Sequence, residues 1–271
     1  MSDSKILFLD IDDTLLCRDK TLTPENDALI RTALQEGHHI VICSGRPLAG
    51  ILPVAERLDL LKPGCFLIAF NGGLIYDCGK KKPVFEKTLP LKDVRLLFKK
   101  ADEHGLYIQT YDDRNLLIRK ETEETRFYTD RISIIPRVMP DLPDGLEKEP
   151  VKALLVELHD KSRLDRYREE VAPIVKGRVS LFYSSEYLLE CVKEGISKGA
   201  AVKWLCGYLG IPLTSSVAAG DSENDIPMLE AAHVGCAMKN ATGACKAAAD
   251  YITEQDCDHS GVAEIIRRFI L

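Results

Sequence analysis

Short apolar runs alternate with longer amphipathic stretches over the first part of the chain. Three runs contain almost no polar position and read as strands that are covered on both faces of a sheet: residues 6–9, 40–43 and 65–70. The stretch between the first two has the signals of a helix, with Thr23 as the N-cap, Pro24 in the first turn and Gly37 after the end. Strands without alternation that are separated by helices predict a parallel sheet.

The pattern changes between residues 85 and 189. Strand-like segments such as 106–111 and 115–120 alternate and are more polar, and a proline-rich connector follows at 136–150. The alternation of apolar strands and amphipathic helices returns afterwards. A helix is expected over 196–210, where Ser197 is the N-cap and Gly210 lies past the end.

The fold class expected from these patterns is α/β. A doubly wound, mainly parallel, Rossmann-like sheet is formed by residues 1–84 and 190–271, and residues 85–189 are an inserted α+β domain that serves as a lid.

Composition narrows the function classes. Of the 271 residues, 45% are hydrophobic and 29% are charged, which is enough apolar content for a folded core. The net charge of -6 disfavours a nucleic-acid partner. The N-terminus lacks a signal-peptide pattern, and the apolar runs are too short for a membrane span. Nine scattered cysteines without a CxxC pair predict free, buried thiols in a cytoplasmic protein. A zinc site is the alternative, but nothing in the cysteine spacing supports it. The oligomeric state is not readable from the sequence.

Polar and acidic side chains follow four of the expected strands. The clusters are Asp10, Asp12, Asp13 and Thr14; Ser44, Gly45 and Arg46; Asn71, Gly72 and Gly73; and Asp221, Ser222, Glu223, Asn224 and Asp225. Two bare carboxylates about 4 Å apart repel by roughly 4 kcal/mol at an effective dielectric of 20, so a strand end crowded with acids needs a reason. Taken alone, most of these clusters fit a turn or a helix cap, and a lysine near a helix start, such as Lys198, is usually solvated. Because parallel sheets bind ligands at the carboxyl ends of their strands, the set together predicts a ligand site.

Metal-assisted phosphoryl transfer is the chemistry that suits this set. Carboxylates from two strand ends make a hard oxygen site for Mg²⁺, which would relieve their repulsion. Ser44 and the backbone N–H of Gly45 can hydrogen-bond a phosphate, as can Asn224, and Lys198 adds a positive charge. An ionised aspartate beside Mg²⁺ could attack phosphorus and form an acyl phosphate.

Four motifs in order resemble those of the haloacid dehalogenase (HAD) superfamily, specifically the Cof-type subfamily with class IIB caps. They are "DIDDT" at residues 10–14, "CSGR" at 43–46, "ISKG" at 196–199 and "GDSEND" at 220–225. The "NGG" after the third strand and the "NAT" at 240–242 are also similar to family sequences. The match covers nearly the whole chain, and four motifs in order are a specific signal.

The resemblance implies a role for each motif residue. Asp10 would be the nucleophile. Asp12 would act first as the general acid that protonates the leaving oxygen and then as the base that activates water. Thr14 would position Asp12. The implied phosphoryl-binding set is Ser44, Gly45, Lys198 and Asn224. The implied Mg²⁺ ligands are Asp10, Asp12 through its carbonyl, and Asp221, and the supporting residues are Arg46 and Asp225. The inserted domain would be the cap that closes over the site.

Asp13 departs from the family pattern, since many members have glycine there. Aspartate tolerates unusual backbone angles better than most residues, so the turn can survive. Its charge either faces solvent or tunes the metal site.

The function expected is an Mg²⁺-dependent phosphatase acting on a small phosphorylated metabolite, with a sugar phosphate as one candidate. A phosphohexomutase is the enzymatic alternative, because some mutases share this cap class. A phosphate-binding or signalling protein is the other alternative. It is disfavoured, because a receiver domain needs an aspartate after its third strand and this chain has "AFNGG" there.

Overall fold

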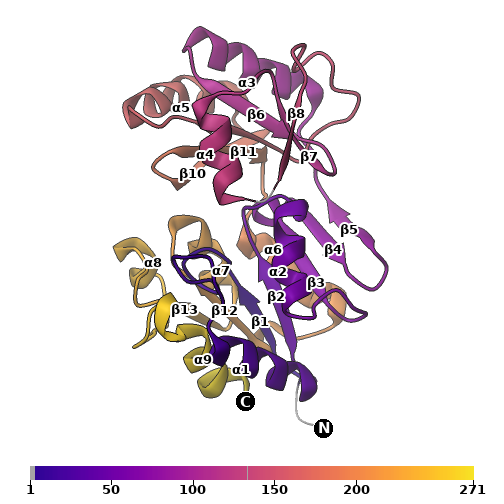
Figure 1. The fold of residues 1–271 in the computed structure, drawn as a ribbon, viewed down its shortest axis with the longest axis vertical. Helices are drawn as coiled ribbons and strands as arrows, with labels where there is room; N and C mark the ends of the chain where they lie inside the picture. Colours follow the sequence, from indigo (N-terminus) through magenta and orange to yellow (C-terminus); the bar gives the residue numbers. More distant parts are fainter. Residues whose placement is uncertain (1–3, 133) are drawn as a thin grey trace. The chain divides into compact units, whose positions relative to one another are not determined.

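The computed structural model describes residues 4–132 and 134–271, which form two compact units (Figure 1). The first unit contains the described residues up to Gly45, Ile51–Val84 and Ser197–Leu271. The second contains Arg46–Gly50 and Phe85–Ile196.

The first unit is built on an eight-stranded sheet in the order β14-β13-β12-β1-β2-β3-β4-β5. The pairs from β14 to β3 are parallel, and β4 pairs antiparallel with β3. The strands are β1 (Ile6–Leu9), β2 (His39–Cys43), β3 (Phe66–Ala69), β4 (Leu74–Asp77), β5 (Lys82–Glu86), β12 (Ser216–Gly220), β13 (Val234–Ala237) and β14 (Tyr251–Ile252). The predicted doubly wound, mainly parallel sheet is confirmed.

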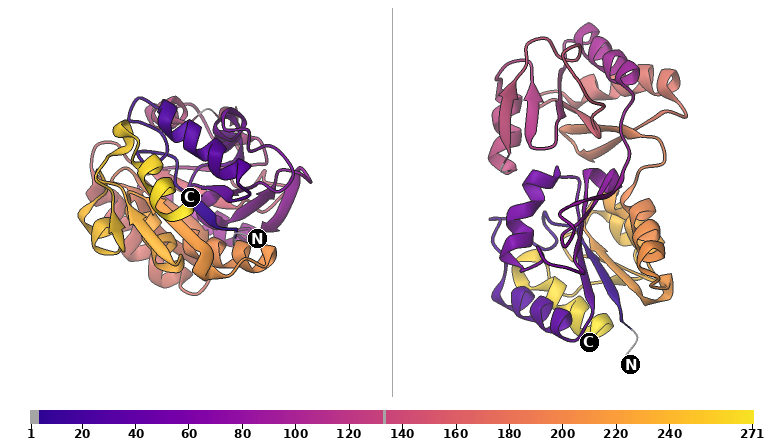
Figure 2. Two further views of the ribbon diagram at one scale, coloured as in Figure 1. Left: turned by 90° about the horizontal axis from the view of Figure 1, so that it is seen from below. Right: turned by 90° about the vertical axis from the view of Figure 1, so that its right-hand side faces the viewer.

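Helices cover both faces of this sheet (Figure 2). One face carries α1 (Pro24–Gln35), α2 (Leu48–Arg57) and α9 (Gly261–Ile265), and the other carries α6 (Lys198–Leu209) and α7 (Ile226–Ala231). Shorter elements are α8 (Gly243–Ala247), the 3-10 turns η1 (Phe70–Gly72), η2 (Leu213–Ser215), η3 (Glu223–Asp225) and η4 (Cys257–His259), and the π-turn η5 (Ile266–Ile270).

The predicted caps of two helices are present. The Thr23 side chain accepts a hydrogen bond from the Asn26 N–H at the start of α1, and the Ser197 side chain accepts one from the Ala200 N–H at the start of α6. Gly210 ends α6 in a left-handed conformation, with φ of 68°. Because Ser197 caps α6, Lys198 stands in the first helical position of α6, where its side chain is completely buried.

The second unit is an α+β layer with a six-stranded sheet in the order β10-β11-β9-β6-β7-β8. Its strands are β6 (Tyr107–Tyr111), β7 (Asn115–Ile118), β8 (Ile135–Val138), β9 (Lys152–Val156), β10 (Val179–Ser185) and β11 (Leu188–Lys193), and its helices are α3 (Leu91–Glu103), α4 (Glu123–Arg131) and α5 (Lys161–Val175). A core that includes Leu97, Phe98, Leu155 and Tyr167 joins α3 and α5 to one face of the sheet.

The second unit extends past residue 189, where the sequence pattern suggested that the inserted segment ends. Strand β11 runs on to Lys193, and its residues Glu190 to Val192 pair with β9. These residues are buried in the ladder, so the unit continues to Ile196. The sequence has no change of pattern at this point that would mark the true end of the strand.

No helix within the described residues is both long and apolar enough to cross a membrane. All nine cysteines are buried and free, as predicted from their spacing.

Candidate active site

The end of β1 brings Asp10 to the centre of the sheet edge. The four residues of β1 are fully buried, and the chain leaves the strand at Asp10. The Asp10 N–H donates to the carbonyl oxygen of Ala219 in β12 at 3.1 Å, which continues the register of the two neighbouring strands. The loops that follow β1 and β12 therefore start side by side, so the two acidic clusters predicted from the sequence meet.

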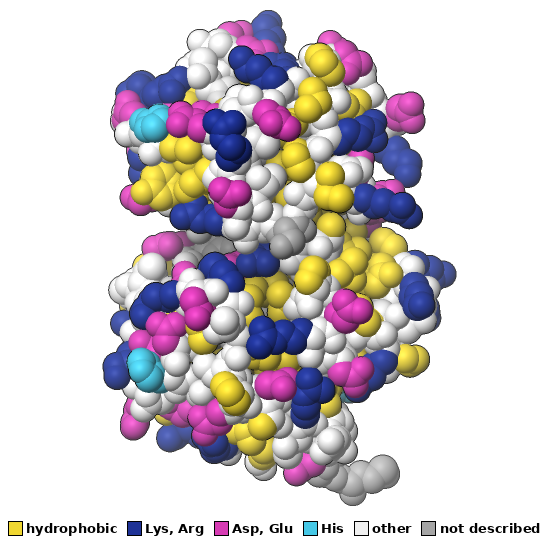
Figure 3. Space-filling view, viewed as in Figure 1, with side chains coloured by type: hydrophobic (Ala, Val, Ile, Leu, Met, Phe, Trp, Pro, Cys, Tyr) yellow, Lys and Arg dark blue, Asp and Glu magenta, His cyan; other side chains and the backbone are white. Residues whose placement is uncertain are grey.

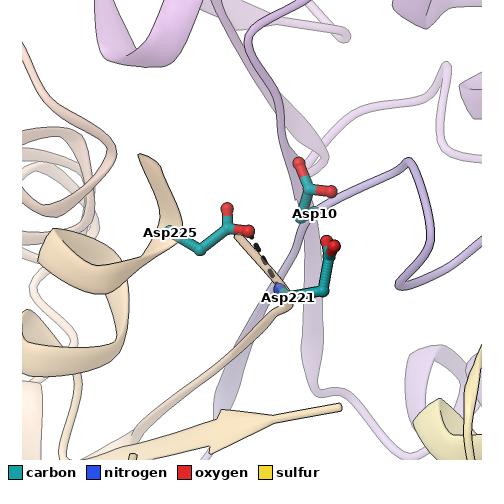
Figure 4. Close-up of side chains that lie close together, drawn as sticks. All are labelled: Asp10, Asp221 and Asp225. Carbon is teal, nitrogen blue, oxygen red and sulfur yellow. Dashed lines mark hydrogen bonds between the residues drawn. The ribbon is translucent and has the colours of Figure 1, made fainter. Parts of the chain in front are cut away.

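Three carboxylates from these loops lie close together. One oxygen from each of Asp10, Asp221 and Asp225 lies within 4.8 Å of the others, and Figure 4 shows the three side chains gathered at the strand ends. Burial is the largest cause that raises the pKa of Asp10, and the neighbouring carboxylates raise it further. The cluster is thus an electrostatically costly arrangement that a cation would relieve.

Lys198 is one such cation within the protein itself. Its Nζ donates to Asp10 Oδ1 at 2.5 Å and also to Asp225 Oδ1. Burial alone would lower the pKa of Lys198, but the two carboxylates outweigh burial and raise it, so the side chain is charged. Lys198 is therefore a buried ammonium group that connects the nucleophile candidate to Asp225.

Asp225 stabilises the turn after β12. Its Oδ2 accepts hydrogen bonds from the N–H groups of Asp221 and Ser222, both at 3.0 Å. A Cβ at Gly220 would lie 2.4 Å from the Cβ of Asp225, so only glycine leaves room for this side chain. Both oxygens of Asp225 therefore have hydrogen-bond donors, one from Lys198 and two from the backbone.

Asp221 accepts hydrogen bonds from two hydroxyl groups. Thr14 Oγ1 donates to Oδ1 at 3.1 Å and Ser222 Oγ donates to Oδ2 at 3.0 Å. Burial, followed by the charge of Asp225, raises the pKa of Asp221 to about 7. The Thr14 hydroxyl thus contacts Asp221, because the loops after β1 and β12 are adjacent.

Asp12 and Asp13 lie on the more exposed side of the same loop. Lys20 Nζ donates to Asp12 Oδ1 at 3.0 Å and lies 4.0 Å from Asp13 Oδ1. Asp13 has a left-handed backbone, with φ of 59°, and its side chain is 45% exposed. The turn at residue 13 is therefore made by an aspartate whose charge reaches solvent, beside Lys20.

The phosphoryl-binding candidates lie at the ends of β2, β12 and α6. Ser44 is buried, and its carbonyl oxygen accepts a hydrogen bond from the Asn71 N–H at 3.0 Å. Asn224 Nδ2 donates to Asn71 Oδ1 at 3.1 Å. Arg46 groups with the second unit, and its Nη1 donates to the Gly50 carbonyl oxygen at 3.2 Å.

Two asparagines contribute to this region although the sequence assigned them no role. Asn71 contacts both Ser44 and Asn224, and Asn240 Nδ2 donates to the Asp13 carbonyl oxygen at 2.7 Å while its Oδ1 accepts from the Cys257 N–H. The sequence signals were the "NGG" and "NAT" strings, but the partners of each asparagine come from distant parts of the chain.

The residues present fit a divalent metal ion. The available ligand atoms are carboxylate oxygens, which Mg²⁺ prefers, and the pKa values of Asp10 and Asp221 are raised where a cation would lower them. Asp10, Asp221 and Asp225 are the carboxylates that could hold such an ion.

Comparisons with known proteins agree on a family. A family model described as haloacid dehalogenase-like hydrolase matches residues 7–266. A haloacid dehalogenase-like hydrolase from Bacteroides thetaiotaomicron has a solved structure that superposes with a TM-score of 0.90, at 32% identity over 98% of this chain and 99% of that one. The 5-amino-6-(5-phospho-D-ribitylamino)uracil phosphatase YcsE of Bacillus subtilis is 28% identical over 99% of this chain and 97% of its own length.

A further likeness concerns the fold alone. The structure of the HAD subclass IIB sugar phosphatase BT4131 matches with a TM-score of 0.84, at 23% identity over 98% of this chain and 99% of that one. The match extends through the second unit, so the fold of that unit is of the class IIB type.

Proposed function

This chain belongs to the haloacid dehalogenase-like hydrolases, a family of phosphatases and phosphotransferases. From that premise we propose that it is an Mg²⁺-dependent phosphatase. Its substrate is a small phosphorylated metabolite, and the reaction passes through an aspartyl-phosphate. The observation that carries the proposal is the buried Lys198 ammonium group, which bridges Asp10 and Asp225 next to Asp221. In this proposal Asp10 is the nucleophile, Lys198 is the cation for phosphate, and Asp10, Asp221 and the carbonyl oxygen of Asp12 are the metal ligands.

The first half-reaction uses Asp10 and Asp12. A carboxylate oxygen of Asp10 attacks phosphorus in line, the bond between phosphorus and the ester oxygen breaks, and Asp12 gives its proton to that leaving oxygen. Asp12 suits this role because its side chain is partly exposed, at 39%, whereas that of Asp10 is buried. When bound, Mg²⁺ supplies charge neutralisation for the phosphoryl oxygens and for the carboxylates.

The second half-reaction regenerates the enzyme. Asp12 removes a proton from water, the water oxygen attacks phosphorus, and the bond to the Asp10 oxygen breaks, which releases inorganic phosphate. Lys198 stays within reach of the Asp10 oxygen throughout, and Ser44, the Gly45 N–H and Asn224 hold the transferring group.

The substrate class rests on relatives and on the second unit. A metabolite phosphatase is supported by the name of the relative YcsE, and a sugar phosphate is a candidate because BT4131 is a sugar phosphatase of similar fold. We assign the second unit the role of a cap inserted into the first unit, and Arg46 and Asp225 supporting roles.

The compartment and partners form part of the same proposal. Nine free thiols are typical of a reducing compartment, which supports a cytoplasmic location. The net charge of -6 supports a small-molecule substrate and no nucleic-acid partner.

Replacing the nucleophile tests the proposal. Asp10→Asn keeps the shape of the side chain but removes its charge, so hydrolysis of p-nitrophenyl phosphate with Mg²⁺ is expected to fall on the order of 1,000-fold or more. Asp59→Asn, at an exposed acid of the same unit, is the control and is expected to keep wild-type activity. Substantial Mg²⁺-dependent hydrolysis by Asp10→Asn would refute Asp10 as the nucleophile.

A screen of phosphorylated metabolites then identifies the substrate. Release of inorganic phosphate from one compound with a high kcat/KM is the expected result. Formation of an isomeric phosphate without inorganic phosphate would instead make the protein a mutase.

A further inference from the structure

The chain after β3 adopts an unusual backbone conformation. Phe70, Asn71 and Gly72 have φ values of 53°, 57° and 99°, so three successive residues are left-handed and only one of them is glycine. Gly72 is required, because a Cβ there would lie 2.5 Å from the Ser197 carbonyl oxygen. Asparagine tolerates the left-handed region, but a phenylalanine there is strained, and such strain is often found where a side chain is held for function.

The side chain that this turn presents is that of Asn71. It is 1% exposed, and its Oδ1 accepts the hydrogen bond from Asn224 Nδ2. With both amides oriented in this way, Nδ2 is the other end of the Asn71 side chain. Among the described residues, Asn71 Nδ2 has no hydrogen-bond partner. Burying a hydrogen-bond donor without an acceptor costs free energy, so an acceptor atom that enters this site would be bound favourably.

The sheet order places this amide over the candidate active site. Asn71 follows β3 and Asn224 follows β12, and the strands between them are β1 and β2. A hydrogen bond between the two asparagines therefore crosses the carboxyl ends of β1 and β2, where Asp10 and Ser44 stand. The amide also lies against the backbone of Gly45, since a Cβ there would be 3.2 Å from Asn71 Nδ2.

Another asparagine shows that an unpaired amide is not sufficient evidence. Asn26 is also buried, with Nδ2 unpaired and Oδ1 accepting from the Ala263 N–H at 2.8 Å. It lies within the regular helix α1 and joins that helix to α9, with no strand end nearby in the chain. The strained turn and the position across β1 and β2 distinguish Asn71.

We propose that Asn71 is a phosphoryl-binding residue. Its Nδ2 donates a hydrogen bond to a non-bridging oxygen of the transferring group, while its Oδ1 holds Asn224 in place for the same task. As a neutral donor, Asn71 adds a contact without disturbing the charge balance between Lys198 and the carboxylates. This inference rests on the proposed phosphatase function, because it deepens the description of the same site.

Two substitutions of Asn71 test the proposal with inorganic phosphate as the probe. Asn71→Asp keeps the shape and can still accept from Asn224, but it cannot donate and it repels phosphate. Asn71→Gly removes the amide and tolerates the left-handed backbone. In calorimetric titrations with Mg²⁺ present, both are expected to bind phosphate at least about tenfold more weakly, as for the loss of one charge-assisted hydrogen bond. KM for p-nitrophenyl phosphate is expected to rise as well.

Asn26→Asp is the matched control. It alters a buried asparagine with the same hydrogen-bond pattern, and it is expected to leave phosphate affinity and KM unchanged even if it lowers the melting temperature. Circular dichroism of each variant confirms that it is folded, and Asn71→Gly serves if Asn71→Asp does not fold.

The outcomes separate this inference from the proposed function. A wild-type phosphatase whose phosphate affinity and KM are unaltered by either Asn71 substitution would overturn the assignment of Asn71 alone. A protein that hydrolyses no phosphate ester, yet loses phosphate binding when Asn71 is replaced, would overturn the phosphatase and retain Asn71 as a phosphate ligand. Equal losses in the Asn26 and Asn71 variants would also reject the inference.

Discussion

At the scale of single residues, the candidate site is a problem of unbalanced charge. Asp10, Asp221 and Asp225 gather at one place, and Lys198 supplies the positive charge that the protein itself provides. A lysine at a helix start would ordinarily be solvated, but here its side chain is completely buried between two carboxylates. The remaining negative charge lies between Asp10 and Asp221, which is the reason to expect a metal ion there.

The first prediction at this scale concerns Asp221 as a metal ligand. Asp221→Ala removes one candidate ligand, so the Mg²⁺ concentration for half-maximal activity is expected to rise by about tenfold or more. Glu223→Ala removes an exposed acid two positions away and is expected to leave the Mg²⁺ requirement unaltered. A metal dependence unchanged in Asp221→Ala would argue against a ligand role.

The second prediction concerns pH and the stability of the metal-free protein. The pKa of Asp221 is raised to about 7 from 3.8, so the folded state holds a proton that the unfolded state releases. The free energy of unfolding therefore falls as pH rises through this window, and Asp10 acts in the same direction. Calorimetry in EDTA is expected to show a lower melting temperature above pH 7 than near pH 5.

A third prediction concerns how stabilisation by Mg²⁺ depends on pH. Because a carboxylate must lose its proton to bind the ion, Mg²⁺ should raise the melting temperature more above pH 7 than near pH 5. Asp221→Asn cannot titrate and should flatten the pH dependence. Stabilisation by Mg²⁺ that does not vary with pH would contradict the raised pKa as the cause.

At the scale of secondary-structure elements, close approach of α6 to α7 holds Lys198 in position. A Cβ at Gly199 in α6 would lie 2.0 Å from the Pro227 carbonyl oxygen in α7, so the two helices can pack only with glycine at this position. Lys198, the residue before Gly199, is thus positioned by this close helix packing as well as by its bonds to Asp10 and Asp225. Gly207 in the same helix has nothing within 4 Å of such a Cβ.

These two glycines make a matched pair. Gly199→Ala forces α6 away from α7 and is expected to lower the free energy of unfolding by about 2 kcal/mol or more, with a loss of activity as Lys198 shifts. Gly207→Ala is expected to raise it by roughly 0.5–1 kcal/mol, because alanine favours a helix. Urea denaturation measures both. Equal changes in the free energy of unfolding for the two variants would mean that α6 and α7 leave room for a methyl group at residue 199.

At the scale of the whole molecule, the thiols are buried while charged side chains are common on the surface. Lysine, arginine, aspartate and glutamate side chains are interspersed over the face seen in Figure 3. All nine cysteines are buried, and burial raises the pKa of Cys206 to about 11 and that of Cys78 and Cys236 to about 12. Since the thiolate is the reactive form, these thiols are protected by both inaccessibility and protonation.

Thiol chemistry checks this description. A thiol-reactive dye at about pH 8 is expected to label the native protein far more slowly than the protein in guanidinium chloride, where all nine cysteines should react. Mg²⁺ and phosphate should slow native labelling further if they stabilise the fold. Rapid labelling of one native cysteine would show that the element around it opens readily.

The sequence by itself determined the fold class and indicated which strand ends would come together. Uninterrupted apolar strands separated by capped helices can form only a covered parallel sheet, and such a sheet brings its strand ends to one edge. For this reason Asp10, Ser44 and Asp221 could be grouped without knowing any distance. The free, buried state of the thiols also followed from composition and spacing.

Only the tertiary structure decided which of these residues touch. The contact of Thr14 with Asp221, the burial of Lys198 and the amide of Asn71 over β1 and β2 depend on strand order and helix approach, which local sequence does not encode. The same holds for the continuation of the second unit to Ile196, since β11 pairs with β9 up to Val192 and with β10 up to Lys193. Pairing between distant segments, and not the pattern within each segment, sets these features.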